Sequence, residues 1–572
     1  MRNAGILLLS ATAAILHGQT DVVMDAMKDE LARSMKQLTV ENLEKAYFIS
    51  YRIVDSDNAS VAASFGSLNQ SNAGRSRMLT VEVRVGDYKL DNSHFFSLNL
   101  DPGTRLVIFN GTVELGLEDD YKEIRRQLWL ATDATYKKAV EDLSSKRALF
   151  QTRSREDEAD DFTREDPVTS SQEQPPVKVD IPKWQNEARS ISALFRKMPG
   201  IYTSMVTFNS VNSYTRFLTS EGTSYTRRQS NVMFNSEAAT QTADGTPLDD
   251  FVWFHGRSLA DLPSEQELTA RVQALGQRLS DLRDASTLMN YNGPVLAEGD
   301  AATQLFRLVF LPSLIGAKPT INGLPGALQS ALQGLPGLPG NGNQGENPFL
   351  DKIGARVLPE FLSVTDNPAI EEYQNHHMSG FSKVDEDGMR SREVPLVEKG
   401  ILKTLLTSRD PVRGINHSTG SRHAGSASPS NVIVTASTGL SEADLRARFL
   451  ELVKQRNLPF GIAVRRMRNV VNAVLAYKVF PDGHEELVRN VQFFGLNAAA
   501  FKNIVAGSSS LNFLTVRFEP PRNNPLSVPI EENFTPVSLA VPSLVFEDVT
   551  VRRGRGATPT PPVAGHPYFD KQ

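Results

Sequence analysis

Four histidines, His376, His377, His417 and His423, form the only cluster among the nine histidines of this 572-residue chain. Imidazole nitrogens are common ligands of zinc and other transition metals, so these residues are candidates for a metal site with a non-standard ligand set. Adjacent histidines in a loop usually point apart. Hydrogen-bonded histidines of a cleft or surface are therefore the simpler interpretation, and the metal site is kept as the alternative.

The chain contains no cysteine, which excludes disulfides, thiol nucleophiles and thiolate metal ligands. Other local motifs are incomplete. His484 and Glu485 begin like the helix of a zinc peptidase, but no second histidine follows at the required spacing. The acidic run 385–388 lacks the ligand loop of a calcium site and is more typical of a hairpin tip. Neither a G-x-S-x-G nucleophile turn nor a phosphate-binding P-loop is present.

The overall charge argues against a nucleic-acid partner. Lysine and arginine total 61 and aspartate and glutamate total 66, giving a net charge of -5. A protein that binds a phosphate backbone needs a basic surface to release counterions. The one basic cluster, Arg552, Arg553 and Arg555, adjoins a Pro-rich tail at 552–572 and is interpreted as solvated.

The N-terminus has the pattern of a secretory signal peptide. An apolar run at 4–16 follows a short basic start and precedes polar residues, which predicts a signal peptide at 1–19. The run is too short for a stable membrane anchor, and no later segment reaches spanning length. We therefore expect a secreted or periplasmic protein without a transmembrane segment.

Periodic patterns predict an N-terminal α+β domain over 20–290. Apolar residues at helical spacing indicate helices, and β-branched and aromatic runs bounded by turn residues indicate strands. A charged, Pro-containing stretch at 153–182 is expected to be a flexible insertion or surface loop. The expected helices are 22–38, 119–149, 190–198 and 265–285, and the expected strands are 46–53, 60–66, 77–85, 204–209, 213–219 and 223–235.

The second half of the chain, 291–551, is dominated by short strands and turns and is expected to form a strand-rich domain. Within it, the stretch 323–345 has too many Gly and Pro residues for a helix or strand and lacks the strict repeat of collagen. We expect a mobile loop there.

A series of short motifs in this half resembles the TldD/PmbA family in one consistent order. The resemblance covers about 293–551, and it implies the fold expected above, an α+β N-terminal domain followed by a strand-rich TldD/PmbA-type C-terminal domain. The motifs are YNGPVLAEGDAA at 291–302, PEFLSVTDNP at 359–368, VDEDG at 384–388, PLVEKGILK at 395–403, LLTSR at 405–409, STGSR at 418–422 and PSLVFE at 542–547.

TldD-type peptidases carry a His-Glu-x-x-x-His motif on the segment that 291–302 resembles, with a later cysteine as a further zinc ligand. A catalytic zinc needs protein ligands, an open position for water and a nearby base. Placing the motif on this sequence puts Ala297 and Ala302 at the two histidines and Glu298 at the glutamate. Only Glu298 keeps its residue type, and an acidic residue at a helix start is more often favoured by the helix dipole than by catalysis.

By resemblance the chain belongs with the metal-free PmbA (TldE) subunits, which pair with a metal-bearing TldD subunit to enclose a peptide-cleaving chamber. We expect a homodimer or such a heterodimer that holds extended peptide through strand-edge hydrogen bonds and has no cofactor. Two alternatives remain open. One is a stand-alone metallopeptidase that uses zinc at the four-histidine cluster with Glu298. The other is a non-catalytic binding protein of the cell envelope.

Overall fold

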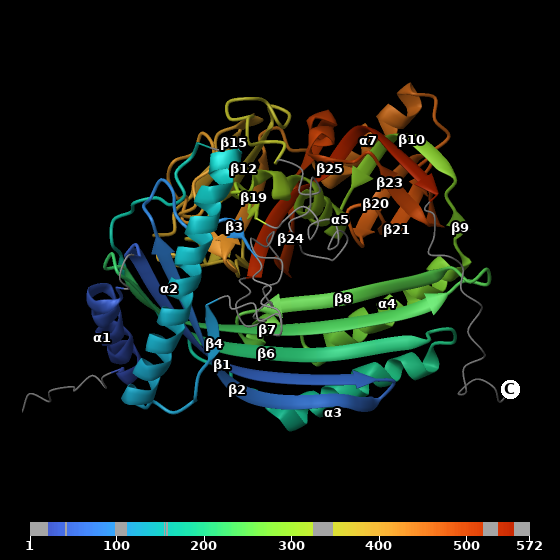
Figure 1. Cartoon of the computed structure of the whole chain (residues 1–572). Coiled ribbons are helices and arrows are strands. Elements are labelled where there is room, and N and C mark those ends of the chain that lie inside the picture. The colour runs from blue at the N-terminus through green and yellow to red at the C-terminus, as the bar shows by residue number, and fades with distance from the viewer. Residues whose placement is uncertain are drawn as a thin grey trace, which may run out of the picture.

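The structure is a computed structural model that describes residues 21–39, 43–97, 111–153, 155, 158–323, 347–518 and 536–553. The predicted signal peptide, nearly all of the Gly/Pro-rich stretch at 323–345 and the tail beyond Arg553 lie outside the described residues. Two sheets with separate cores form the described part, one built from each half of the chain. Figure 1 shows the C-terminal half lying over one face of the N-terminal sheet.

The N-terminal sheet is built from four long strands and has the order β4-β2-β1-β6-β7-β5, with β8 paired to β7. The β1–β2 and β6–β7 hairpins are antiparallel, and β1 and β6 join them at the centre. The strands are β1 (Ala46–Ser64), β2 (Ser67–Val85), β4 (Thr112–Glu114), β5 (Thr169–Gln172), β6 (Thr203–Thr219), β7 (Ser224–Gln241) and β8 (Pro247–Gly256).

The helices of this domain cover two separate areas of the sheet, as Figure 1 shows. The first two pack on β1 and β2 around Tyr51 and Tyr136. The third packs mainly on β1 and β6 and the fourth on β7 and β8, around Phe208 and Phe234. Asp21, Asp120, Asp180 and Ser264 cap the N-termini of the four helices by accepting hydrogen bonds from backbone amides. The helices are α1 (Val22–Gln37), α2 (Tyr121–Thr152), α3 (Ile181–Ser192), η1 (Ala193–Lys197), η2 (Leu259–Asp261) and α4 (Glu265–Asp284).

The predicted helices at 22–38, 119–149 and 265–285 are confirmed, but two expectations for the strands of this domain are wrong. The expected strand pairs 46–53 with 60–66 and 204–209 with 213–219 are single strands, β1 and β6, because neighbours on both sides pair with their polar middle sections. The helix expected at 190–198 is helical as far as Lys197, but it begins earlier than expected, because α3 starts at Ile181 and η1 continues from Ala193.

The segment 153–182, expected to be flexible, is built into the fold over its described residues. It contributes β5, which pairs in parallel with β7, and it buries the side chains of Asp161 and Phe162. Asp161 accounts for the difference from the expectation, because this carboxylate contacts the buried ammonium groups of Lys146 at 2.7 Å and Lys318 at 3.0 Å.

The C-terminal domain contains a twelve-stranded sheet within the described residues, with the order β16-β15-β12-β19-β25-β10-β20-β21-β22-β9 and with β23 and β24 also paired to β25. Its strands are β9 (Ser286–Thr287), β10 (Asn290–Ala297), β12 (Leu362–Asp366), β15 (Val394–Glu398), β16 (Ile401–Leu402), β19 (Asn431–Ala436), β20 (Gly461–Met467), β21 (Ala473–Val479), β22 (Glu485–Arg489), β23 (Val491–Phe494), β24 (Ile504–Arg517) and β25 (Pro536–Arg553).

The remaining elements cover this sheet or connect the two halves. A short parallel pair, β3 with β11, joins a loop of the N-terminal domain to the C-terminal domain. None of the helices in the described part combines the length and apolar composition needed to cross a bilayer. These elements are β3 (Phe95–Phe96), α5 (Asp300–Leu305), η3 (Phe306–Phe310), η4 (Leu311–Leu314), β11 (Ile321–Asn322), β13 (Glu372–Tyr373), β14 (His376–His377), β17 (Arg422–His423), β18 (Ser426–Ala427), α7 (Glu442–Gln455) and η5 (Ala498–Asn503).

Candidate functional site

The outer strands of the N-terminal sheet present two different faces because side chains alternate along a strand. Along β7, Val232, Phe234 and Ala238 are buried in the core formed with α3 and α4. The residues between them point the other way, and Met233 lies opposite His255 of β8. This second face is turned toward the C-terminal domain (Figure 1).

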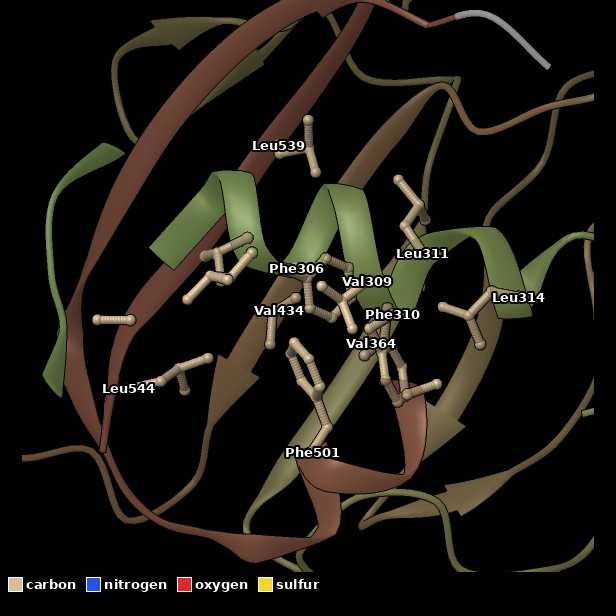
Figure 2. Close-up of a cluster of buried hydrophobic side chains, with 14 of the residues drawn as sticks. Phe306, Val309, Phe310, Leu311, Leu314, Val364, Val434, Phe501, Leu539 and Leu544 are labelled. Carbon is tan, nitrogen blue, oxygen red and sulfur yellow. The ribbon is translucent and has the colours of Figure 1, made fainter. Parts of the chain in front are cut away.

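The helical segment that faces this sheet begins directly after β10. Gly299 has a φ of +58°, a left-handed conformation that favours glycine, and it turns the chain into α5. A π-helical turn, η3, then follows. Figure 2 shows Phe306 and Phe310 of this turn among the buried side chains of the C-terminal core. Gln304 and Arg307, on the same segment, instead line a cavity between the two domains.

This interdomain cavity has a volume of about 850 Å³, within the range of about 300–1,000 Å³ that is typical of ligand pockets. Phe251 and Trp253 of β8 and Met205 of β6 supply apolar walls on the side of the N-terminal sheet. The ends of β20 and β24 complete the opposite side together with the helical segment. The cavity therefore combines an aromatic wall with a few polar groups.

Two of the three acidic residues of the cavity lining pair with arginines, and the third, Glu237, is exposed on β7. Asp249 pairs with Arg468. Asp250 is buried and accepts hydrogen bonds from Arg278 at 2.7 Å and from Arg466 at 3.0 Å. These pairs cross from β8 to α4 and β20, so they also fix the position of β8 against the C-terminal domain.

Three polar side chains of the cavity lining have buried atoms without a hydrogen-bond partner among the described residues. One is the Ser204 hydroxyl, and the other two belong to ionisable groups, Nε of Arg307 and Nδ1 of His255. Burial lowers the pKa of the Arg307 guanidinium, and burial likewise lowers the pKa of His255 to about 4. At neutral pH the imidazole is therefore uncharged, whereas an arginine keeps its charge in proteins.

Sequence reasoning did not single out either group, although the sequence carries a signal for Arg307. It is the only charged residue in the apolar run LFRLVFLPSLI at 305–315. A charge inside such a run requires either a partner or a cavity. His255 carries no comparable signal, since an imidazole in an alternating strand is commonplace.

The residues predicted to occupy the zinc motif lie outside this cavity lining. Ala297 ends β10 and Ala302 lies in α5, and both side chains are fully buried. Glu298 contacts Arg465 at 2.6 Å and Arg446 at 3.7 Å. Ala297 and Ala302 are therefore part of the hydrophobic interior, and Glu298 belongs to a cluster of ion pairs.

The four histidines predicted as an alternative metal site are not arranged as one ligand set. His376 and His377 are exposed on β14, where the His376 ring stacks on Phe513 with ring centres 3.7 Å apart. His417 is exposed on a loop. His423 is buried, contacts the Ser430 hydroxyl at 2.9 Å, and has a pKa lowered by burial to about 4.

The residues present do not fit a family-type zinc site. Over the described residues, no group of three or more His, Cys, Asp or Glu side chains is placed to hold a metal. The chain has no cysteine at all, and alanine has no lone pair to offer at the predicted histidine positions. We therefore derive no chemical step through zinc in this chain.

A second concentration of charge lies where loops of the C-terminal domain meet the N-terminal sheet. Arg84 of β2 contacts Asp410 at 2.9 Å, and Arg52 of β1 contacts Glu386 at 3.2 Å. Asp385 accepts hydrogen bonds from the backbone amides of Asp387 and Met389, which confirms the turn predicted at 385–388. These buried pairs hold the two domains in one arrangement and so define the interdomain cavity.

Asp366, at the end of β12, is a buried carboxyl group whose pKa makes the stability of this domain depend on pH. Its side chain is fully buried, one carboxylate oxygen accepts a hydrogen bond from the Ser430 amide at 3.0 Å, and the other has no partner among the described residues. Burial raises its pKa from 3.8 to about 7. The folded state therefore holds a proton that the unfolded state has lost between about pH 4 and 7, so this contribution to stability falls as pH rises.

We expect Asp366→Asn to remove this loss of stability with rising pH. As pH rises from 5 to 8, the free energy of unfolding of the variant should gain a few kcal/mol relative to that of the wild type, because one pKa unit corresponds to about 1.4 kcal/mol. Urea unfolding at both pH values measures the difference. His423 titrates in both proteins and cancels in the comparison. Parallel stability curves for the two proteins would show that the carboxyl group is not perturbed.

Comparisons with known proteins agree with the fold described above. A family model for the PmbA/TldA metallopeptidase C-terminal domain matches residues 339–553. A metalloprotease of Methanothermobacter thermautotrophicus is 27% identical over 174 residues, which cover 28% of this chain and 36% of that protein. The chain thus matches little more than a third of the length of its curated relatives at most.

Two solved structures resemble nearly the whole chain. A candidate modulator of a DNA gyrase from Thermotoga maritima has a TM-score of 0.57 and 14% identity, with 92% of this chain and 99% of that one covered. TldE from Thermococcus kodakarensis has a TM-score of 0.54 and 12% identity over the same shares. At these identities the likeness shows a common fold, including the pairing of an N-terminal α+β domain with a strand-rich C-terminal domain.

Proposed function

Because this chain belongs to the TldD/PmbA family, we propose that it is a metal-free, PmbA/TldE-like subunit that shapes a peptide-cleaving chamber together with a metal-bearing TldD-type partner. In this proposal the partner supplies the zinc chemistry, and this chain supplies walls and peptide contacts. A homodimer is the form expected without such a partner. The proposal also places the protein outside the cytoplasm, on the basis of the apolar run at 4–16.

The observation that carries the proposal is an intact interdomain cavity whose helical wall offers no metal ligands. The helical segment presents Gln304 and Arg307 to the cavity, and the chain contains no cysteine. Buried ion pairs still hold the two domains together, between Arg84 and Asp410 and between Asp161 and Lys318. A cavity kept in this way without ligands supports a role in holding peptide rather than in cleaving it.

The edge of β8 supports an extended peptide as the bound species. Among the described strands, β8 pairs only with β7, so the backbone groups of 247–256 that point away from β7 form an outer edge. At Phe251 this edge is already occupied, because its amide donates to Asp250 and its carbonyl accepts from Arg466. Peptides add to such an edge through main-chain hydrogen bonds, which tolerate many side chains. Residues of β8 also line the interdomain cavity, so an added strand would run along its rim.

Coexpression with a relative from the same organism that carries His-Glu-x-x-x-His tests the proposal. We expect one mixed complex on size-exclusion chromatography at micromolar concentration, with zinc bound by the relative, and faster peptide cleavage than by the relative alone. Separate elution combined with equal cleavage by the relative alone would contradict pairing. Binding of peptides without any pairing would favour an envelope binding protein, and stoichiometric zinc on this chain alone would favour the stand-alone peptidase.

A matched pair of variants tests the role of the cavity within that complex. Trp253→Ala removes an aromatic wall, and the loss of a contact worth about 1–2 kcal/mol should lower kcat/KM for peptide by about tenfold. Trp129→Ala, on the exposed face of α2, should leave kcat/KM unchanged. Both complexes should elute as the wild type does. Equal kcat/KM values for the two variants would place peptide binding elsewhere.

A further inference from the structure

Arg307 lies at the wall of a cavity and has no counterion among the residues that the structure describes. No hydrogen bond or ion pair joins its guanidinium to another of the described residues, and its Nε atom is buried. Burial lowers the pKa of this group, and no carboxylate of the described residues forms an ion pair with it. Of the three acids in the lining, Asp249 and Asp250 are engaged by other arginines. Glu237 is exposed, and no ion pair joins it to Arg307.

Arg307 is partly buried, and a charge that is partly removed from water and has no counterion is stabilised when an anion joins it. The planar guanidinium presents parallel N–H donors that match the two oxygens of a carboxylate. The surrounding walls are apolar on the side of the N-terminal sheet, with Phe251, Trp253 and Met205. A ligand suited to this space therefore joins a carboxylate to an apolar body.

We propose that the interdomain cavity binds the C-terminal carboxylate of an apolar peptide through the guanidinium of Arg307. The last side chains of the peptide would pack against Phe251 and Trp253, and its backbone would continue along the outer edge of β8 beyond Phe251. The choice of a peptide rests on the proposed function, whereas the carboxylate site belongs to this chain alone. Nδ1 of His255, on the β8 side of the cavity, is available for a hydrogen bond to the same peptide.

The proposal is tested by calorimetric titration of the purified full-length chain with acetyl-Leu-Ala-Leu-Phe as the free acid and as the C-terminal amide. The wild type should bind the acid about tenfold to a hundredfold more tightly, as expected for one charge-assisted hydrogen-bonded pair. Equal affinities for the two peptides would overturn the proposal, and this comparison requires no variant.

Variants assign the selectivity to Arg307. Arg307→Met keeps the apolar stem and should bind acid and amide equally, with the amide affinity close to that of the wild type. Arg307→Lys keeps the charge but loses the forked geometry and should retain part of the preference for the acid. Arg271→Met, an exposed arginine of α4, is the control and should behave as the wild type. Full selectivity in Arg307→Met would overturn the assignment.

Two further readouts separate this inference from its alternatives. Arg307→Met should melt at the same or a higher temperature than the wild type without peptide, whereas an arginine paired within the fold would make the variant melt lower. Hexanoate should compete only weakly with the peptide acid. Competition as strong as that of the peptide would identify a small organic acid as the ligand and overturn the peptide assignment. If the chain prefers the peptide acid but forms no mixed complex, the carboxylate site is supported and the proposed pairing is contradicted. If it forms the mixed complex but does not prefer the acid, the pairing is supported and the carboxylate site is contradicted.

Discussion

Asp161→Asn should lower the free energy of unfolding by about 3–5 kcal/mol, because removal of one charge leaves buried partners uncompensated. The Asp161 carboxylate contacts Lys146 and Lys318, whose side chains are 1% and 6% exposed. Asparagine keeps the volume of the side chain, so the loss reports the charge. Chemical denaturation at pH 7 measures it.

The same variant should also show a characteristic pH dependence. Burial already lowers the pKa of Lys146, and Asp161 opposes that effect. Without the carboxylate, the folded protein should favour the neutral amine while the unfolded chain stays protonated, so the deficit should shrink as pH rises above neutrality. Asp133→Asn, which breaks an exposed pair with Lys137 on α2, is the control and should cost about 0.5 kcal/mol or less. A similar small cost for Asp161→Asn would mean that the two lysines are hydrated.

Phe310→Ala should destabilise the C-terminal domain by about 3–5 kcal/mol, the usual cost of deleting a buried aromatic side chain. Phe310 is fully buried and packs against Phe306, Phe349 and Phe501, with ring centres 5.1–5.3 Å apart. Figure 2 shows it on the helical segment that crosses the core. Urea unfolding followed by circular dichroism measures the loss.

The control for this variant is Phe494→Ala, which truncates a phenylalanine that is 58% exposed at the end of β23. We expect a change within about 0.5 kcal/mol for it, as is usual for surface positions. If Phe310→Ala cost no more than the control, the helical segment would not be anchored in the core, and the positions of Gln304 and Arg307 would lose their support.

The two alanines at the predicted zinc positions illustrate the difference between aligning a motif and locating a site. The motif register was taken from the resemblance at 291–302, and it remains a prediction. In the fold, Ala297 and Ala302 face the core, and the cavity begins two residues later, at Gln304. Sequence spacing along a strand-to-helix junction does not define which side faces a cavity, because the turn at Gly299 sets the rotation of the helix.

Local patterns in the sequence determined much of this protein without reference to its tertiary structure. Capped, amphipathic segments became α1, α2 and α4 close to their predicted ends, because helix formation depends on neighbours three and four residues apart. Turns and short motifs likewise predicted the strand-rich second half and its resemblance to the TldD/PmbA family, and a family model matches 339–553. The absence of cysteine excluded a thiolate ligand.

Only the tertiary structure decided what depends on contacts between distant segments. The polar middle sections of β1 and β6 are strand because neighbours on both sides pair with them, and 158–182 is ordered because Asp161 meets Lys146 and Lys318. The four histidines are separated for the same reason, since their loops lie in different places in the fold. Arg307 and His255 line one cavity although 52 positions in the sequence separate them, because only the packing of one domain on the other brings β8 and the helical segment together.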